Sequence, residues 1–284
     1  MVTVEDYVGL EPTWCKGCGN FQILKSLNQA LVNLGLEPYQ VLMVSGIGDA
    51  GKLPHYSKGN IFHALHGRHI PVAIGARIAF PELKVLAIGG DGDTYGEGGN
   101  HLVHALRRNF DITCLVHNNQ VYGLTKGQAS PTSDPGFETT TTPQGAGPAI
   151  NPIALAIGSG ASFLGRGFAG DSEHLTVLIQ QAIDFRGFAL VDILQPCVSF
   201  NFKNTFKWFR ERVYRLDEDD EYDPADKKAA LDKAGEWGER IPIGVIYREE
   251  RPIFEHHILG EDTVPLARQS ISPELAKGLL SEFY

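Results

Sequence analysis

The chain lacks the features that would place it in a membrane or on nucleic acid. It has no uninterrupted apolar run of about 18 residues, the length that a membrane-spanning helix needs. Its opening, Met-Val-Thr-Val-Glu-Asp, has neither the basic stretch nor the apolar core of a secretion signal. Positive charge is also scarce, because 25 Lys and Arg stand against 34 Asp and Glu, a net charge of −9. We therefore expect a soluble cytoplasmic protein that binds neither membrane nor nucleic acid.

Cysteine is scarce too, with four in 284 residues. In a cytoplasmic protein this number favours metal or redox chemistry over structural disulfides. Cys15 and Cys18 have the spacing that lets two thiolates bind one metal ion or one cluster, and Cys197 follows an expected strand and a proline. Cys114 lies inside an expected strand, where a small buried apolar role is commoner than ligation. Spacing alone leaves a zinc site or a redox pair open.

The apolar residues that are present fall into short runs separated by helix-like stretches. A hydrophobic content of 43% and a charged content of 21% are typical of a globular protein. The expected strands are Val41–Ser45, Val85–Ile88, Ile112–His117 and Leu190–Leu194. The expected helices span about Asn20–Leu34, Pro71–Ala79, Tyr95–Arg108 and Ser172–Arg186. This alternation predicts an α/β fold with a doubly wound, mostly parallel sheet.

Two other segments differ in character from the alternating region. Residues 123–152 are rich in Gly, Thr and Pro, and we expect an ordered active-site loop there, because so long a loop inside a domain is usually functional or disordered. After Asn204 come a group of aromatic residues, the acidic run Asp217–Glu221 and a Lys/Ala-rich helix near 225–235. We therefore expect a cofactor-binding domain at 1–204, and a C-terminal extension at 205–284 that packs on this domain or on a partner chain.

Two short motifs carry the strongest chemical information. Gly-Asp-Gly at 90–92 and Asn-Asn at 118–119 each follow an expected strand, and Asp91 and Asn119 are 28 positions apart. Ligands collect beyond the carboxyl ends of parallel strands, and oxygen side chains there suit Mg²⁺ beside a diphosphate. Either motif alone would be an ordinary turn. A dinucleotide site is disfavoured, because Tyr95 stands at the expected third glycine position.

Together these motifs resemble the cofactor signature of thiamine diphosphate enzymes, and further segments narrow the likeness. They resemble the β subunits of 2-oxoacid:ferredoxin oxidoreductases, with the 2-oxoglutarate branch as the nearest match. The resemblance spans most of the first 210 residues. The segments that carry it are Thr13-Trp14-Cys15-Lys16-Gly17-Cys18-Gly19-Asn20, Gly46-Ile47-Gly48 with Lys52-Leu53-Pro54, His66-Gly67-Arg68, Gly89–Gly96, Asn118–Gln128, and Pro196-Cys197 with Asn204-Thr205.

The resemblance implies a specific reaction. The family decarboxylates a 2-oxoacid on thiamine diphosphate, passes electrons through a 4Fe–4S cluster to ferredoxin and forms an acyl-coenzyme A. Some members run in reverse and fix CO₂. The activating glutamate belongs to a second α/β domain, for which this chain has no room. The resemblance thus implies an α subunit that supplies this pyrimidine-side domain, in an αβ heterodimer or an (αβ)₂ assembly.

The resemblance also assigns residues. Asp91, Asn119 and the carbonyl of Val121 would hold Mg²⁺. The candidate catalytic residues are Lys52, Lys126 and His66. Lys52 would pair with the distal carboxylate of 2-oxoglutarate, or it is an ordinary surface lysine. The expected cofactor-binding residues are Gly48, His66, Gly90, Asp91, Gly92, Asp93, Asn119, Val121, Gly123 and Leu124.

One position departs from the family pattern. Cys15, Cys18 and Cys197 would bind the cluster, but Asp49 stands where family members use a fourth cysteine. Asp49 then ligates the fourth iron, or that iron is labile or bears water, or Asp49 lies near the cluster without ligating it. A carboxylate is a harder ligand than a thiolate, so the substitution should retune the reduction potential.

Two other functions stay open at this point. One is an oxidoreductase for pyruvate or for a broad range of 2-oxoacids. The other is a non-catalytic metal-binding subunit with a Cys₃Asp zinc site.

Overall fold

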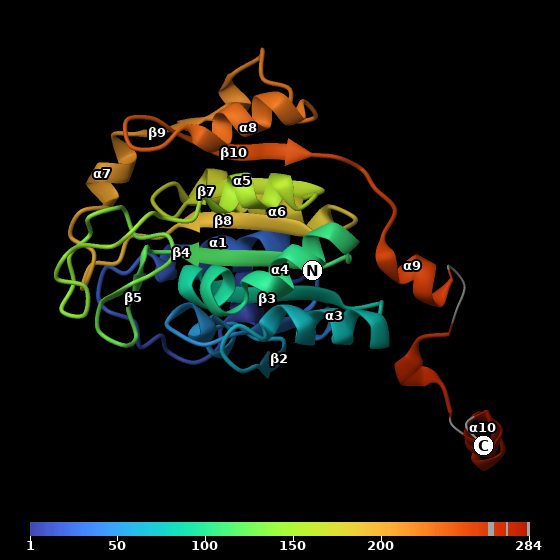
Figure 1. Cartoon of the computed structure of the whole chain (residues 1–284). Coiled ribbons are helices and arrows are strands. Elements are labelled where there is room, and N and C mark those ends of the chain that lie inside the picture. The colour runs from blue at the N-terminus through green and yellow to red at the C-terminus, as the bar shows by residue number, and fades with distance from the viewer. Residues whose placement is uncertain (261–263, 271, 283–284) are drawn as a thin grey trace.

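An eight-stranded sheet forms the middle layer of the protein, whose computed structural model describes residues 1–260, 264–270 and 272–282 (Figure 1). The strand order is β2-β1-β3-β4-β8-β7-β10-β9. The strands are β1 Val41–Ser45, β2 Asn60–His63, β3 Lys84–Gly90, β4 Thr113–Asn118, β7 Phe163–Phe168, β8 Ala189–Leu194, β9 Val213–Arg215 and β10 Ile241–Arg248. Every neighbouring pair is parallel except β10 and β7. The predicted doubly wound, mostly parallel sheet is confirmed.

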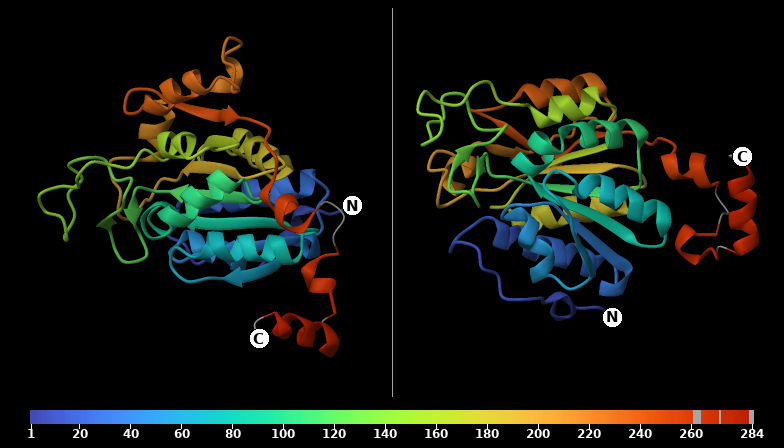
Figure 2. Two further views of the ribbon diagram at one scale, coloured as in Figure 1. Left: turned by 45° about the vertical axis from the view of Figure 1, so that its right-hand side comes forward. Right: turned by 60° about the horizontal axis from the view of Figure 1, so that its bottom comes forward.

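Helices cover both faces of this sheet, as the right-hand view of Figure 2 shows. One face carries α1 (Asn20–Asn33) and α6 (Ser172–Asp184). The other face carries α3 (His69–Ala79), α4 (Gly99–Arg108), α5 (Pro152–Gly158) and α8 (Lys227–Gly235). Successive strand residues point to opposite faces, so Leu86 and Ile88 of β3 pack toward the first layer and Val85 and Ala87 toward the second.

Shorter elements complete the described part of the chain. They are α2 Leu53–Tyr56, α7 Phe206–Arg210, α9 Phe254–Leu259, α10 Pro273–Ser281, and the hairpin of β5 Val121–Tyr122 and β6 Gln128–Ala129. The short helical turns are η1 Val4–Tyr7, η2 Pro38–Gln40, η3 Ala50–Lys52, η4 Gly92–Glu97, η5 Leu216–Glu218 and η6 Leu266–Arg268. Of the helices in the described residues, none is both long and apolar enough to cross a membrane.

The segment after Asn204 extends the same sheet. Strand β10 pairs antiparallel with β7, with Gly244 opposite Arg166, and β9 lies parallel to β10 at the edge. The aromatic group predicted in this segment packs through Phe209 against Phe168. Residues 261–263, 271 and 283–284 of the expected extension lie outside the described residues. The boundary at 204 therefore stays a prediction, although the described residues 205–248 pack on the preceding domain.

The parallel strands bring four distant loops to one edge of the sheet. Strands β1, β3, β4 and β8 run in the same direction, so the segments that follow them gather on the side where the arrow of β4 ends in Figure 1. These segments contain Asp49, Asp91, Asn119 and Cys197 respectively. We therefore expect the functional site at the carboxyl edge of the sheet.

Candidate functional site

Asp91 is positioned by the end of β3. The chain leaves the strand at Gly90 and turns at once into a π-helical turn, η4, a feature that often marks functional positions. The carboxylate is buried, with 2% of the residue exposed, and its Oδ2 accepts hydrogen bonds at 2.5 Å from Ser130 Oγ and Thr132 Oγ1. Burial raises the pKa of Asp91 to about 6, against the lowering effect of the two hydroxyls. A bound cation would relieve this cost, which fits a metal ligand.

Asn119 lies beyond β4 in a turn that its own side chain stabilises. Its Oδ1 accepts the N–H of Val121 at 3.0 Å, and its carbonyl accepts Asn201 Nδ2 at 3.1 Å. Asp91, Asn119 and Val121 line a common cavity of about 90 Å³. Carboxylate, amide and carbonyl oxygens are the donors that Mg²⁺ takes together with phosphate oxygens. The residues present therefore fit this ion.

The same cavity gathers every residue predicted to bind the cofactor. The lining includes Gly48, His66, Gly90, Asp91, Gly92, Asp93, Asn119, Val121, Gly123 and Leu124. It also includes four residues that were not predicted to bind the cofactor, namely Ile47, Ala50, Tyr122 and Thr125. The structure thus places the predicted set in one site, while the role of each residue remains a prediction.

Asp93 joins separate loops beneath this cavity. Its Oδ1 accepts the N–H groups of Gly67 at 2.7 Å and Ile47 at 3.2 Å, and His66 Nδ1 lies 2.9 Å away. Its Oδ2 lies 3.0 Å from Nδ1 of the buried His69. Burial would raise the pKa of Asp93, but the contacts with His69, Gly67 and Ile47 outweigh burial and lower it. An ionised carboxylate with these partners is suited to hold the two loops in place around the cavity.

A second cavity of about 210 Å³ adjoins the first and contains the sulfur atoms. Both cavities are lined by Asp49, Asn119, Gly123 and Leu124. The further lining of the second cavity includes Cys15, Cys18, Cys197, Lys52 and Lys126. All four predicted cluster ligands, three thiols and one carboxylate, are therefore collected beside the predicted Mg²⁺ site.

Two thiols of this cavity, those of the half-buried Cys18 and the buried Cys197, are in an environment that keeps them protonated. Burial raises the pKa of Cys18 to about 12 and also raises that of Cys197. Such thiols become good ligands only when a metal takes the place of the proton. Cys114, in contrast, is fully buried in the core on β4 and lines neither cavity, as the sequence predicted. Within the described residues, no three His, Cys, Asp or Glu side chains are grouped as a single metal ion would require.

Asp49 and Lys52 form an ion pair that was not predicted from the sequence. Lys52 Nζ lies 3.0 Å from Asp49 Oδ1, and the two side chains are 31% and 30% exposed. Trp14 Nε1 donates to the Asp49 carbonyl at 2.8 Å, which anchors the loop. The spacing of three residues could have suggested the pair. An ion pair exposed to this degree contributes roughly 0–1 kcal/mol to the free energy of unfolding. Either partner can therefore pair with another charge at little cost.

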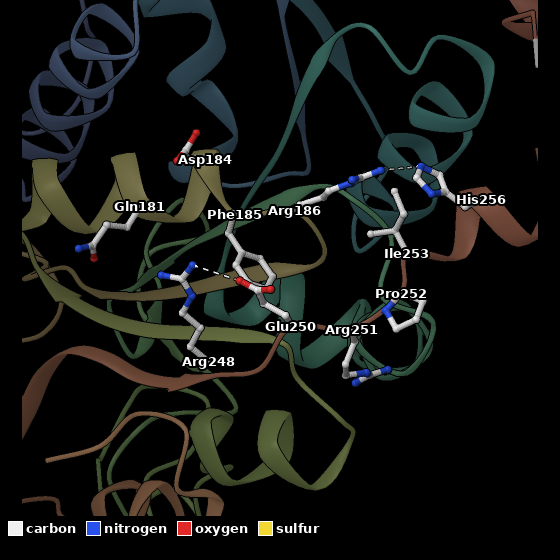
Figure 3. Close-up of a pocket in the computed structure, with 10 residues that line it drawn as sticks. All are labelled: Gln181, Asp184, Phe185, Arg186, Arg248, Glu250, Arg251, Pro252, Ile253 and His256. Carbon is white, nitrogen blue, oxygen red and sulfur yellow. Dashed lines mark hydrogen bonds and ion pairs between the residues drawn. The ribbon is translucent and has the colours of Figure 1, made fainter. Parts of the chain in front are cut away.

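A larger hollow of about 860 Å³ lies at the opposite edge of the sheet, around the start of β8 and the end of β10 (Figure 3). Three arginines surround it, and all three already have partners. Arg251 Nη2 donates to the carbonyl of Arg107 at 3.0 Å. Arg186 Nη2 lies 3.1 Å from His256 Nε2, and Arg248 Nη2 lies 3.8 Å from Glu250 Oε1. No residue predicted to act in binding or catalysis lines this hollow. Its size therefore does not identify it as the site.

Family comparisons agree with the fold and with the location of the site. Residues 44–193 match the family described as "Thiamine pyrophosphate enzyme, C-terminal TPP binding domain". Residues 197–261 match the family that describes the C-terminal part of the "Pyruvate ferredoxin oxidoreductase beta subunit". The first match contains the strands that deliver Asp91 and Asn119. The class of protein is therefore that of thiamine pyrophosphate enzymes.

Individual relatives narrow this class. The chain is 49% identical over 249 residues to "2-oxoacid:ferredoxin oxidoreductase subunit beta" of Saccharolobus solfataricus, covering 84% of this chain and 82% of that one. It is 41% identical over 196 residues to "2-oxoglutarate synthase subunit KorB" of Archaeoglobus fulgidus, covering 68% and 73%. The chain belongs to the family of 2-oxoacid:ferredoxin oxidoreductase β subunits. The predicted family and enzyme class are confirmed.

A solved structure supports the same assignment. The 2-oxoglutarate:ferredoxin oxidoreductase from Magnetococcus marinus, described with 2-oxoglutarate, coenzyme A and succinyl-CoA bound, matches with a TM-score of 0.87 at 36% identity. The match covers 90% of this chain and 88% of that chain. The predicted thiamine-type α/β fold is confirmed.

Proposed function

We propose that the chain is the β subunit of a 2-oxoglutarate:ferredoxin oxidoreductase. In this reaction 2-oxoglutarate and coenzyme A give succinyl-coenzyme A and CO₂, and two electrons pass through a 4Fe–4S cluster to ferredoxin. The reverse direction would fix CO₂. The observation that carries the proposal is the pair of adjoining cavities, one lined by Asp91 and Asn119 and the other by three cysteines. The choice of 2-oxoglutarate is supported by the names of the relatives.

Each part of the site has a distinct task in this proposal. Thiamine diphosphate, when bound, supplies the carbanion chemistry that decarboxylation needs. Asp91, Asn119 and the Val121 carbonyl would hold Mg²⁺ and, through it, the diphosphate. Lys126 and His66 line the same pair of cavities and would orient the acid. These roles are proposals that rest on the positions of the side chains.

The sulfur-lined cavity would hold the cluster. Cys15, Cys18 and Cys197 would supply three thiolates, with Asp49 as the fourth ligand or directly beside the fourth iron. Because this cavity shares Gly123 with the predicted Mg²⁺ site, electrons leaving the substrate would have a short path to the cluster. Ferredoxin would accept them in a cytoplasmic αβ or (αβ)₂ complex.

The substrate assignment is tested with the anaerobically purified αβ complex. We expect ferredoxin reduction with 2-oxoglutarate to exceed that with pyruvate by about tenfold to a hundredfold in kcat/KM. One charge-assisted contact from Lys52 to the distal carboxylate contributes roughly 1.5–3 kcal/mol, which corresponds to this ratio. Iron and sulfide analysis of the same sample checks the cluster. Equal rates with pyruvate would favour the broad-range alternative, and a colourless zinc protein would refute the electron-transfer role.

Lys52→Ala supplies the matched variant for this test. It should lose most of the preference for 2-oxoglutarate and should change the rate with pyruvate little. Lys58→Ala, which removes an exposed lysine of the same region, serves as the control. An equal loss with both acids would show that Lys52 supports the fold or the cofactor and does not select the substrate.

Asp49→Ala should weaken the cluster without unfolding the chain. Removal of the carboxylate leaves three thiols for four irons, so we expect lower iron retention or a shift in reduction potential. Asp49→Cys should retain the cluster and also shift its potential. Iron content and an electron paramagnetic resonance redox titration measure both effects. An Asp49→Ala complex with unchanged iron and unchanged potential would contradict the assignment of Asp49 to the cluster.

A further inference from the structure

The loop that follows β6 reaches back to Asp91. Ser130 Oγ and Thr132 Oγ1 each lie 2.5 Å from the same carboxylate oxygen, Asp91 Oδ2. The two residues are 39 and 41 positions from Asp91, and both are buried. Neither residue lines the cavity that Asp91 faces. Their hydroxyls therefore reach Asp91 from residues outside the lining of this cavity.

Internal hydrogen bonds give this loop a defined shape. The N–H of Ser130 donates to Ser133 Oγ at 2.8 Å, and Ser133 Oγ donates to the carbonyl of Gln120 at 2.6 Å. The side chain of Gln120 donates in turn to the carbonyl of Thr132 at 2.8 Å. Gln120 directly follows Asn119, so the loop is tied to the turn that carries the second predicted Mg²⁺ ligand. The two hydroxyls are thus held in place and do not depend on a flexible side chain.

The Thr132 hydroxyl has one proton and three possible acceptors, of which Ser130 Oγ at 3.3 Å is the most distant. It lies 2.5 Å from Asp91 Oδ2 and 2.9 Å from Asn118 Oδ1. A hydroxyl donates one hydrogen bond, and a donor to an ionised carboxylate forms the shorter and stronger bond. Asp91 is therefore the acceptor that the distances favour. Two donors on one oxygen fix the rotation of the carboxylate and leave its other oxygen for the cavity.

We propose that Ser130 and Thr132 are positioning residues that orient the Asp91 carboxylate for Mg²⁺ and the diphosphate. This inference rests on the proposed function, because it takes Asp91 as a metal ligand. Partners that hydrogen-bond a metal ligand set its orientation, and their removal typically lowers metal affinity by about tenfold to a hundredfold. The loop at 128–134 thereby becomes part of the metal site, although no atom of Ser130 or Thr132 needs to touch the metal.

The test measures metal affinity directly in the αβ complex. The complex is stripped of Mg²⁺ and cofactor and is then titrated with Mn²⁺ in the presence of thiamine diphosphate, with free Mn²⁺ followed by electron paramagnetic resonance. Ser130→Ala and Thr132→Val should each raise the Kd for Mn²⁺ by about tenfold to a hundredfold. Thr132→Ser and Ser130→Thr keep the hydroxyl and should bind Mn²⁺ nearly as the unmodified complex does.

Thr142→Val is the matched control, because Thr142 lies in the same long loop and its hydroxyl contacts Thr139 Oγ1 at 2.7 Å, not Asp91. It should leave the Kd unchanged. If the unmodified complex binds no Mn²⁺ with the cofactor, the proposed function fails. If it binds and the Ala and Val variants bind equally well, the positioning role is overturned. The same conclusion holds if Thr132→Ser is as weak as Thr132→Val, because the hydroxyl is then not the cause.

Discussion

The Asp91→Ala variant of the αβ complex should purify without thiamine diphosphate and should not oxidise a 2-oxoacid. The neighbours Gly90 and Gly92 have no side-chain oxygen that could replace the carboxylate, and Ser130 and Thr132 present hydroxyls that are already directed at it. A bound metal stabilises transition-state charge by several kcal/mol. We therefore expect turnover to fall on the order of a thousandfold or more.

Bound cofactor is measured after purification in excess thiamine diphosphate and Mg²⁺. Asp184→Ala is a suitable control, because this exposed carboxylate lines the hollow at the opposite edge of the sheet. It should retain cofactor fully. Cofactor at the unmodified level in Asp91→Ala would refute the assignment of Asp91 as the metal ligand.

The loss in Asp91→Ala should not come from unfolding. Burial raises the pKa of Asp91 to about 6, above its ordinary value of 3.8. A carboxyl group whose pKa is raised on folding contributes stability below its unfolded pKa, and this contribution is lost as pH rises through the folded value. At neutral pH, where Asp91 is ionised, its side chain therefore destabilises the metal-free fold. Its removal separates the effect on binding from the effect on stability.

The four neighbouring strands β1, β3, β4 and β8 were predicted from the sequence, whereas the strands on either side of this group were not. Runs such as 85–88 and 112–117 are continuous and apolar, because these strands are buried on both faces. Strand β7 reads Phe-Leu-Gly-Arg-Gly-Phe and was missed, because its two glycines and the fully buried Arg166 are untypical of a core strand. Strand β10 contains Pro242 and was missed for a similar reason. Both became strands through tertiary pairing that no local pattern reveals.

The candidate site shows the same division between local and distant information. Asp91 and Asn119 were found because each stands in a short motif directly after a strand. Ser130 and Thr132 were not named individually, because their partner is far away in sequence and a hydroxyl-rich loop has no periodic signal. Only the expectation of an ordered active-site loop at 123–152 pointed toward them. Their contacts with Asp91 place the first part of that loop against the predicted site, and the role of the loop stays a prediction.

The described side chains around the site leave one requirement of thiamine chemistry unmet. The cofactor needs a glutamate at its aminopyrimidine, and no glutamate is among the described residues that line either cavity. The carboxylates that do line them are Asp49, Asp91 and Asp93, of which Asp91 accepts hydrogen bonds from two hydroxyls and Asp93 contacts histidines and amides. The cavity at Asp91 measures about 90 Å³, well below the roughly 300–1,000 Å³ of a typical small-molecule site. Leu124, which lines both cavities, is 46% exposed.

The chain expressed alone should therefore release no CO₂ from 2-oxoglutarate, and activity should appear when its α partner is added. A half-site cannot hold both ends of the cofactor, and it lacks the acid that activates the cofactor. We therefore expect decarboxylation only when the α partner is present. The measurement is CO₂ release from 2-oxoglutarate labelled at C1, the carboxyl carbon beside the keto group. It is made with the isolated chain, with the α partner alone and with the two combined at a fixed ratio. Mass spectrometry of each sample excludes a contaminating partner. Sustained decarboxylation by the isolated chain would contradict the half-site, because the missing glutamate would then have to come from residues that line neither cavity.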